Sequence, residues 1–290
     1  MSRRRIAIIG SRGRLGAALV RAWSDRHDVT SLARPTVDLA KGSTLDAALR
    51  KGGYDLVINC AAFTNVDACE SDPGEAEAVN TDAPARIASL CAAKDMRFIH
   101  VSTDYVFDGR RTIPYTEDVP VSPVSVYGNT KAAGERAVQQ ADPKALIVRV
   151  SWVFGPDRAS FVDMILARAR GDNTVAAIAD KWSTPTYTED LAVWIEALFE
   201  SDPPAGIYHL CNAGECTWQE YAEHALRCAA DIGASLKTTT VRPQKLSDLA
   251  AFVAERPIYT VLDTSKFTNT TGIKPAPWQD AVGRYVRSMT

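Results

Sequence analysis

The sequence predicts an α/β fold, in which a Rossmann-type doubly wound parallel sheet carries a smaller α/β lobe. Short apolar runs alternate with helix-like segments through the first half of the chain, a pattern typical of βαβ units. A glycine-rich turn directly follows the first apolar run and opens the first helix. The length of 290 residues suits one nucleotide-binding domain with a second lobe.

The elements of the first half follow from their local patterns. Apolar runs predict strands at 5–9, 28–32, 56–60, 98–102 and 145–150. The intervening segments predict helices at 15–23, 44–51, 75–93 and 126–140. Since crossovers between parallel strands are right-handed, we expect helices on both faces of one sheet.

The pattern loosens after Gly155, where prolines and glycines become denser. Helices are expected at 160–170, 189–200, 218–230 and 278–289, with short strands at 207–211 and 259–262. We therefore expect a dinucleotide-binding Rossmann domain over residues 1–155. Residues 156–290 should form mainly a substrate-binding lobe, with segments that return to the first domain. A ligand cleft is expected between them, at the carboxyl ends of the strands.

Composition excludes several classes of function. The net charge of −2 offers no basic surface to nucleic acid or to an anionic membrane. The first apolar run is too short for a signal peptide or a membrane span, so we expect a cytoplasmic protein. Six cysteines without a C-x-x-C pair fit free thiols. The four histidines share no ligand spacing, so no metal site is expected.

The glycine-rich turn, Gly10–Gly16, has the spacing G-x-x-G-x-x-G. Such a chain must turn sharply and bring bare backbone close to a pyrophosphate, and side chains would obstruct both. The helix N-terminus then offers free N–H groups to the phosphates. A tight strand-to-helix turn without a ligand is the alternative, but the position after the first strand favours a nicotinamide dinucleotide.

The end of the second strand bears on the choice of cofactor. It reads Leu32-Ala33-Arg34-Pro35, without the acid that would hold the ribose hydroxyls of NAD. Arg34, or Arg12 in the glycine turn, is suited to a 2′-phosphate. The sequence thus favours NADPH and leaves NADH open, and Arg34 as a solvated turn residue is the alternative. After the third strand, Ala61, Ala62 and Thr64 are small enough for close cofactor approach.

A reactive pair stands at the start of the helix 126–140. Tyr127 and Lys131 are four residues apart, so they share one face of the helix. The ammonium group should lower the phenol pKa and let the tyrosine exchange a proton with a carbonyl oxygen. An ordinary surface pair is the alternative. After the fourth strand, Ser102 and Thr103 offer hydroxyls to a substrate carbonyl or, alternatively, cap the strand end.

With these elements in order, the chain resembles the extended short-chain dehydrogenases/reductases and, more narrowly, the dTDP-4-dehydrorhamnose reductase family. The matching segments cover nearly the whole chain, and Ser102–Gly109 is the most specific of them. They are 10–16, 61–67, 79–80, 102–109, 127–131, 134–135, 149–155, 185–186, 190–191, 256–257 and 262–266.

The resemblance implies NAD(P)H-dependent reduction of the 4-keto group of a nucleotide-linked deoxysugar, in the family dTDP-4-dehydrorhamnose to dTDP-rhamnose. It implies a catalytic triad of Thr103, Tyr127 and Lys131. The residues expected at the substrate are Val66, Thr103, Asp104, Tyr105 and Trp152. Those expected at the cofactor are Gly10, Arg12, Gly13, Leu15, Gly16, Arg34, Asp38, Leu39, Ala61, Ala62, Thr64, Ser102, Tyr127 and Lys131. Trp152 as plain core and Asp38 as a helix cap are alternatives. A homodimer and a Mg²⁺ requirement are left open.

Two departures from the family pattern lie in the substrate lobe. Where the family has D-Q-x-G-x-P-T, this chain has Lys181 for the glutamine and Ser183 for the glycine. The region 234–255 also differs. Dehydratases of the same superfamily place a glutamate where Tyr105 stands, so elimination is disfavoured. An epimerase, and a dinucleotide-binding regulatory subunit resembling that of methionine adenosyltransferase, remain alternatives.

Overall fold

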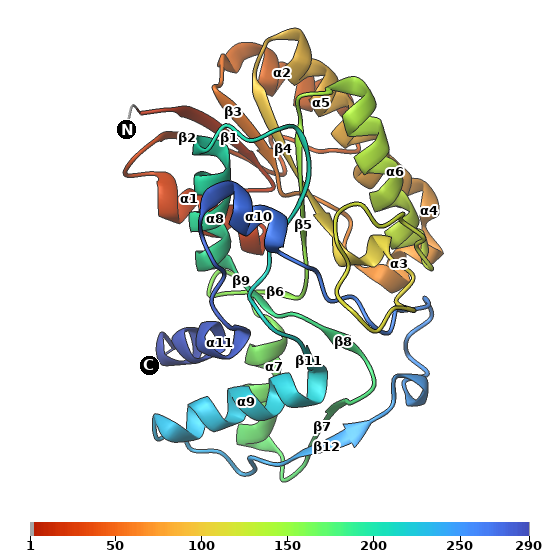
Figure 1. Ribbon diagram of the computed structural model, residues 1–290, viewed down its shortest axis with the longest axis vertical. Coiled ribbons are helices and arrows are strands. Elements are labelled where there is room, and N and C mark those ends of the chain that lie inside the picture. Colours follow the sequence, from red (N-terminus) through yellow and green to blue (C-terminus); the bar gives the residue numbers. More distant parts are fainter. Residues whose placement is uncertain (1–2, 290) are drawn as a thin grey trace.

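Six strands form the main sheet of the computed structural model, which describes residues 3–289 (Figure 1). In sheet order they are β10 (Gly206–His209), β5 (Leu146–Val150), β4 (Arg97–Thr103), β3 (Leu56–Asn59), β1 (Arg5–Ile9) and β2 (Asp28–Leu32). Every neighbouring pair is parallel. The strand order reverses at β1, so the predicted doubly wound α/β fold is confirmed.

Helices cover both faces of this sheet. One face packs against α1 (Arg14–Trp23), α8 (Thr188–Glu200) and α10 (Ser265–Thr271), and the other against α2 (Gly42–Gly52), α5 (Ala83–Ala93) and α6 (Val126–Ala141). The side chains of β1 alternate between these two faces. Ile6 and Ile8 belong to the first core and Ala7 and Ile9 to the second, because successive residues of a strand point to opposite faces.

A second lobe lies beyond the carboxyl ends of the strands, in the lower half of Figure 1. Its elements are β6 (Val153–Phe154), α7 (Phe161–Gly171), β7 (Val175–Ile178), β8 (Trp182–Ser183), β9 (Thr186–Tyr187), β11 (Cys216–Thr217), α9 (Trp218–Asp231), β12 (Val241–Gln244) and α11 (Trp278–Arg287). Helices α7, α9 and α11 share an apolar core. Since β10 pairs with β5, the chain of the second half also contributes to the main sheet. The division at residue 155 stays a prediction.

Two expected elements differ from the structure. The helix expected at 75–93 is α4 (Pro73–Glu77), a π-helical turn (Ala78–Asp82) and α5. In the π turn, the Asn80 side chain bonds the backbone of Phe63, a long-range contact that helical periodicity does not reveal. The strand expected at 259–262 is wrong. Tyr259 and Leu262 each form only an isolated bridge, to Trp182 and Tyr115 respectively, so no continuous ladder forms. The helix α3 (Val66–Ser71) was not expected.

Three further observations concern the chain as a whole. No helix within residues 3–289 combines the length and apolarity needed to cross a membrane. The six cysteines are free thiols. Met1, Ser2 and Thr290, which the expected domain boundaries include, lie outside the described residues.

Candidate active site

The glycine-rich turn lies at the carboxyl end of β1 and leads into α1. Gly10 has φ +79°, and a Cβ there would come within 2.7 Å of the Ala61 backbone nitrogen. A Cβ on Gly16 would come within 2.3 Å of the Gly10 carbonyl oxygen. Both positions therefore require glycine. The N-cap Gly13 makes no side-chain cap, so the first N–H groups of α1 are left for another acceptor, such as the pyrophosphate of a dinucleotide.

Two arginines meet beside this turn. The Nη1 of Arg12 donates a hydrogen bond of 3.1 Å to the carbonyl of Arg34, and both guanidinium groups are exposed. Pairs of exposed guanidinium groups at this position are suited to a phosphate. The structure thus brings together the two residues expected at a 2′-phosphate.

The remaining expected cofactor residues surround the same edge. Asp38 does not cap α2, whose N-cap is Lys41. Its Oδ1 instead accepts the N–H of Ala40 at 3.1 Å and closes the turn. Leu39 is half-buried and packs on the core beneath α2. Leu15 is buried in the core, Ala61 and Ala62 are half-buried, and Thr64 is exposed.

The first turn of α6 carries the reactive pair. Ser125 caps the helix by accepting the N–H of Gly128 at 3.2 Å, and both Tyr127 and Lys131 are buried. Burial raises the pKa of Tyr127, and a hydrogen bond from Thr103 only partly opposes it. The expected lowering of the phenol pKa is therefore wrong for this arrangement. Its physical reason is that the Lys131 Nζ bonds the Val101 carbonyl at 2.8 Å, and desolvation dominates at the phenol.

Two hydrogen bonds fix the Thr103 hydroxyl beside Tyr127. The Thr103 Oγ1 gives its proton to the Asp104 Oδ1 at 3.0 Å and accepts the N–H of Tyr105 at 3.2 Å. Thr103 lies beside the Tyr127 hydroxyl and lowers its pKa, but burial outweighs this effect and keeps Tyr127 a neutral phenol. This is the protonation state that a proton donor needs.

Asp104 is the centre of a buried hydroxyl cluster. Its Oδ2 accepts hydrogen bonds from Ser151 at 2.9 Å, Ser183 at 3.1 Å and Thr260 at 2.6 Å. Only 2% of Asp104 is exposed. Asp104 is engaged by protein hydroxyls, including that of Thr103, and its expected contact with the substrate stays a prediction. Ser183, a departure from the family pattern, belongs to this cluster.

Lys181, the other departure, lies behind Tyr105. Its Nζ donates to the Pro257 carbonyl and lies 5.1 Å from the centre of the Tyr105 ring. Burial lowers the pKa of Lys181 to about 8. The Tyr105 ring meets that of Tyr127 edge to face, with centroids 5.6 Å apart. Val66 packs in the same small cluster, so Val66, Tyr105 and Tyr127 lie together as expected residues of one site.

A buried ion pair between Arg149 and Glu135 lies next to the site and binds Ser102. The hydroxyl of Ser102 donates to the Glu135 Oε1 at 2.5 Å. Arg149 binds the same carboxylate through Nε at 2.8 Å and Nη2 at 2.6 Å. The Ser102 side chain is therefore engaged with Glu135, which leaves Thr103 as the hydroxyl beside Tyr127.

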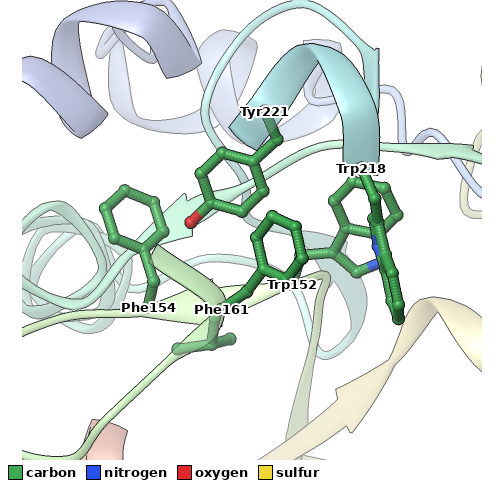
Figure 2. Close-up of a pocket in the computed structure, with 6 residues that line it drawn as sticks. Trp152, Phe154, Phe161, Trp218 and Tyr221 are labelled. Atoms are coloured by element: carbon green, nitrogen blue, oxygen red, sulfur yellow. The ribbon is translucent and has the colours of Figure 1, made fainter. Parts of the chain in front are cut away.

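Trp152, expected at the substrate, lines an aromatic cavity of about 130 Å³. Figure 2 shows its ring between those of Trp218, Phe161 and Tyr221. The Trp152 and Trp218 rings are 5.5 Å apart and nearly perpendicular. Trp152 has φ +38°, a left-handed conformation that few non-glycine residues adopt. The Trp152 Nε1 and the Tyr221 hydroxyl are buried and have no hydrogen-bond partner among the residues that the structure describes.

Sequence reasoning missed three polar residues of the site. Arg14 donates to the carbonyls of Val153 at 3.1 Å and Ala159 at 2.6 Å, and so ties the glycine turn to the second lobe. His100 lies beside Lys131, and Asn59 lies beside His100. For Asn59 and His100 the available signal was a polar residue within an apolar strand, and Arg14 stood within the glycine-rich turn. Among residues 3–289, no group of three metal-binding side chains is found.

The chain is similar to known proteins in both sequence and structure. The family model described as "RmlD substrate binding domain" matches residues 4–290. A dTDP-4-dehydrorhamnose reductase of Sinorhizobium fredii is 34% identical, with 97% of this chain and 96% of the relative covered. One from Streptomyces griseus is 37% identical, with coverage of 94% and 90%. The crystal structure of a Bacillus anthracis dTDP-4-dehydrorhamnose reductase in complex with NADP superposes with a TM-score of 0.92 at 26% identity, and 99% and 100% of the two chains are covered.

Proposed function

The chain belongs to the family of the RmlD substrate binding domain, and from this premise we propose that it is an NADPH-dependent oxidoreductase that reduces the 4-keto group of a nucleotide-linked deoxysugar. The proposed substrate is dTDP-4-dehydrorhamnose and the product dTDP-rhamnose, as named for its relatives. The observation that carries the proposal is the placement of three residues: Thr103 ends β4, and Tyr127 and Lys131 are buried one turn apart on α6.

Each residue of the site has a part in this mechanism. Bound NADPH would supply the hydride to the carbonyl carbon. Tyr127 gives its proton to the carbonyl oxygen, and its raised pKa keeps that proton in place near neutral pH. Thr103, whose hydroxyl is fixed by Asp104, lies beside the phenol. The glycine turn would orient the cofactor and Lys131 would hold its ribose, so most of the rate gain would come from positioning.

The aromatic cavity supports a nucleotide-linked sugar as substrate. Its walls of Trp152, Phe161, Trp218 and Tyr221 are flat apolar surfaces, which suit the face of a base or of a sugar ring. The unpartnered Trp152 Nε1 and Tyr221 hydroxyl add polar groups that a ligand can satisfy. We propose the cytoplasm as the site of action, where thiols such as Cys91 stay reduced.

The test of reaction type is NADPH oxidation against a panel of nucleotide-linked 4-keto sugars. The reductase should oxidise one equivalent of NADPH for each sugar reduced. An epimerase would return its cofactor unchanged, and a regulatory subunit would show no turnover with any member of the panel. Stoichiometric oxidation therefore separates the three alternatives.

Dehydration is expected to be absent. Elimination of water from a nucleotide hexose needs a carboxylate base, and Tyr105 stands at that position with a pKa raised by burial. We expect no 4,6-dehydration product from dTDP-glucose in the presence of NAD, measured by the absorbance of the keto sugar in base. Product formation without net cofactor use would contradict the assignment as a reductase.

NADPH is expected to bind more tightly than NADH, and Arg34→Ala should reduce the difference in affinity between the two cofactors. An exposed arginine that pairs with the 2′-phosphate contributes about 1–3 kcal/mol. Calorimetric titration of both cofactors measures the difference in each variant. Arg110→Ala, which removes an exposed arginine away from the turn, is the matched control and should leave it unchanged. Equal affinities for the two cofactors in the parent protein would refute the prediction.

A further inference from the structure

His100 lies in the middle of β4, fully buried between Asn59 and Lys131. The register of β3 and β4 pairs Asn59 with His100. The His100 Nδ1 is 3.3 Å from the Asn59 Nδ2, and its Nε2 is 3.3 Å from the Lys131 Nζ. Both ring nitrogens therefore face nitrogen atoms, and the partners decide where the imidazole proton lies.

The orientation of the Asn59 amide fixes the imidazole tautomer. Its Oδ1 accepts the backbone N–H of Ala61 at 3.1 Å, so its NH₂ group faces His100. An NH₂ group only donates, and the His100 Nδ1 must accept. Burial holds the pKa of His100 well below its ordinary value. The ring is therefore neutral, with its one proton on Nε2.

This tautomer points an N–H at the nitrogen of Lys131. An ammonium group has no lone pair with which to accept it, whereas a neutral amine has one. The second contact of Lys131, its 2.8 Å bond to the Val101 carbonyl, is satisfied by either form. The Lys131 nitrogen can accept the His100 N–H and donate to the Val101 carbonyl at the same time only when it is a neutral amine.

Other titratable groups face Lys131 from each neighbouring element. Glu135, one turn further along α6, favours the charged lysine, as does Cys60 after β3, and burial opposes both and lowers the pKa of Lys131 to about 8. Tyr127, one turn earlier, is a neutral phenol. The Glu135 carboxylate is bound by Arg149 and Ser102, which limits its pull on Lys131.

We propose that His100 is a positioning residue for Lys131, which presents its Nε2–H to the lysine nitrogen and favours the neutral amine over the ammonium. Loss of this contact should let Lys131 take up a proton from solvent. The value of this step for catalysis rests on the proposed function, because there Lys131 holds the cofactor ribose. The protonation states themselves do not depend on it.

The tautomer can be tested on the unaltered protein. Long-range ¹H–¹⁵N correlation of the His100 ring at pH 7 should show a neutral imidazole with its proton on Nε2. The resonance is assigned by its loss in His100→Gln. An Nδ1–H tautomer, or a doubly protonated ring, would overturn the proposal without any variant having to fold.

The effect on Lys131 is tested by titrating its Nζ in ¹⁵N-lysine-labelled protein, with the signal assigned by its loss in Lys131→Met. His100→Phe removes the facing N–H and should raise the titration midpoint by about one pH unit. His100→Gln keeps an amide N–H near the same place and should stay near the parent midpoint. A His100→Phe protein that titrates like the parent would refute the proposal. Since neither measurement uses turnover, a failure of the proposed reductase activity would leave both results unaffected.

Discussion

Tyr127→Phe is expected to lower the rate of keto-sugar reduction by roughly 10²–10⁴-fold, the usual contribution of general acid catalysis. The change removes one hydroxyl and keeps a ring that packs edge to face against Tyr105. The fold and the affinity for NADPH should therefore survive. Turnover of NADPH with dTDP-4-dehydrorhamnose measures the first effect, and calorimetric titration of NADPH measures the second.

Two further variants test whether the loss of turnover is specific to the Tyr127 hydroxyl. Tyr105→Phe removes a neighbouring hydroxyl that donates no proton in the mechanism, so it should keep far more of the turnover than Tyr127→Phe does. Lys131→Ala should weaken NADPH binding as well as turnover, because the proposed contact with the cofactor ribose is lost. If Tyr127→Phe reduces every accepted sugar at nearly the parent rate, Tyr127 is not the proton donor.

The positions of the reactive groups could be predicted because they depend on strand ends and helical spacing. The carboxyl ends of parallel strands meet at one edge, which brings Gly10 and Thr103 to the same edge of the sheet. Tyr127 and Lys131 share a helix face because they are one turn apart. These features depend only on residues near one another in sequence and on the order of the strands.

The electrostatics of the site could not be predicted in the same way. The phenol pKa was expected to fall because Lys131 is near in sequence, but it rises because the ring is buried. The contacts of Lys131 with Val101 and His100 depend on how α6 packs on β4, and the pairing of Asn59 with His100 depends on strand register. Register and packing are long-range properties, and neither leaves a motif in the sequence.

Strand register also creates a buried ion pair next to the site. The register of β4 and β5 pairs Ser102 with Arg149, and Arg149 meets Glu135 from α6 with side chains only 2% and 4% exposed. The Arg149 Nη1 also lies 3.4 Å from the His209 Nε2. Two charges buried this deeply are stable only while each neutralises the other.

Arg149→Met is therefore expected to lower the free energy of unfolding by about 3–5 kcal/mol, because it leaves the Glu135 carboxylate buried with Ser102 as its one remaining hydrogen-bond donor among those described here. Urea unfolding followed by circular dichroism measures the loss. Lys144→Met is the matched control. It breaks the pair with Asp95, whose side chains are 86% and 90% exposed, and should leave the unfolding midpoint nearly unchanged. Glu135→Leu combined with Arg149→Met should recover part of the lost stability, because no unpaired charge then remains. If Arg149→Met costs no more than Lys144→Met, the buried pair does not hold α6 on the sheet.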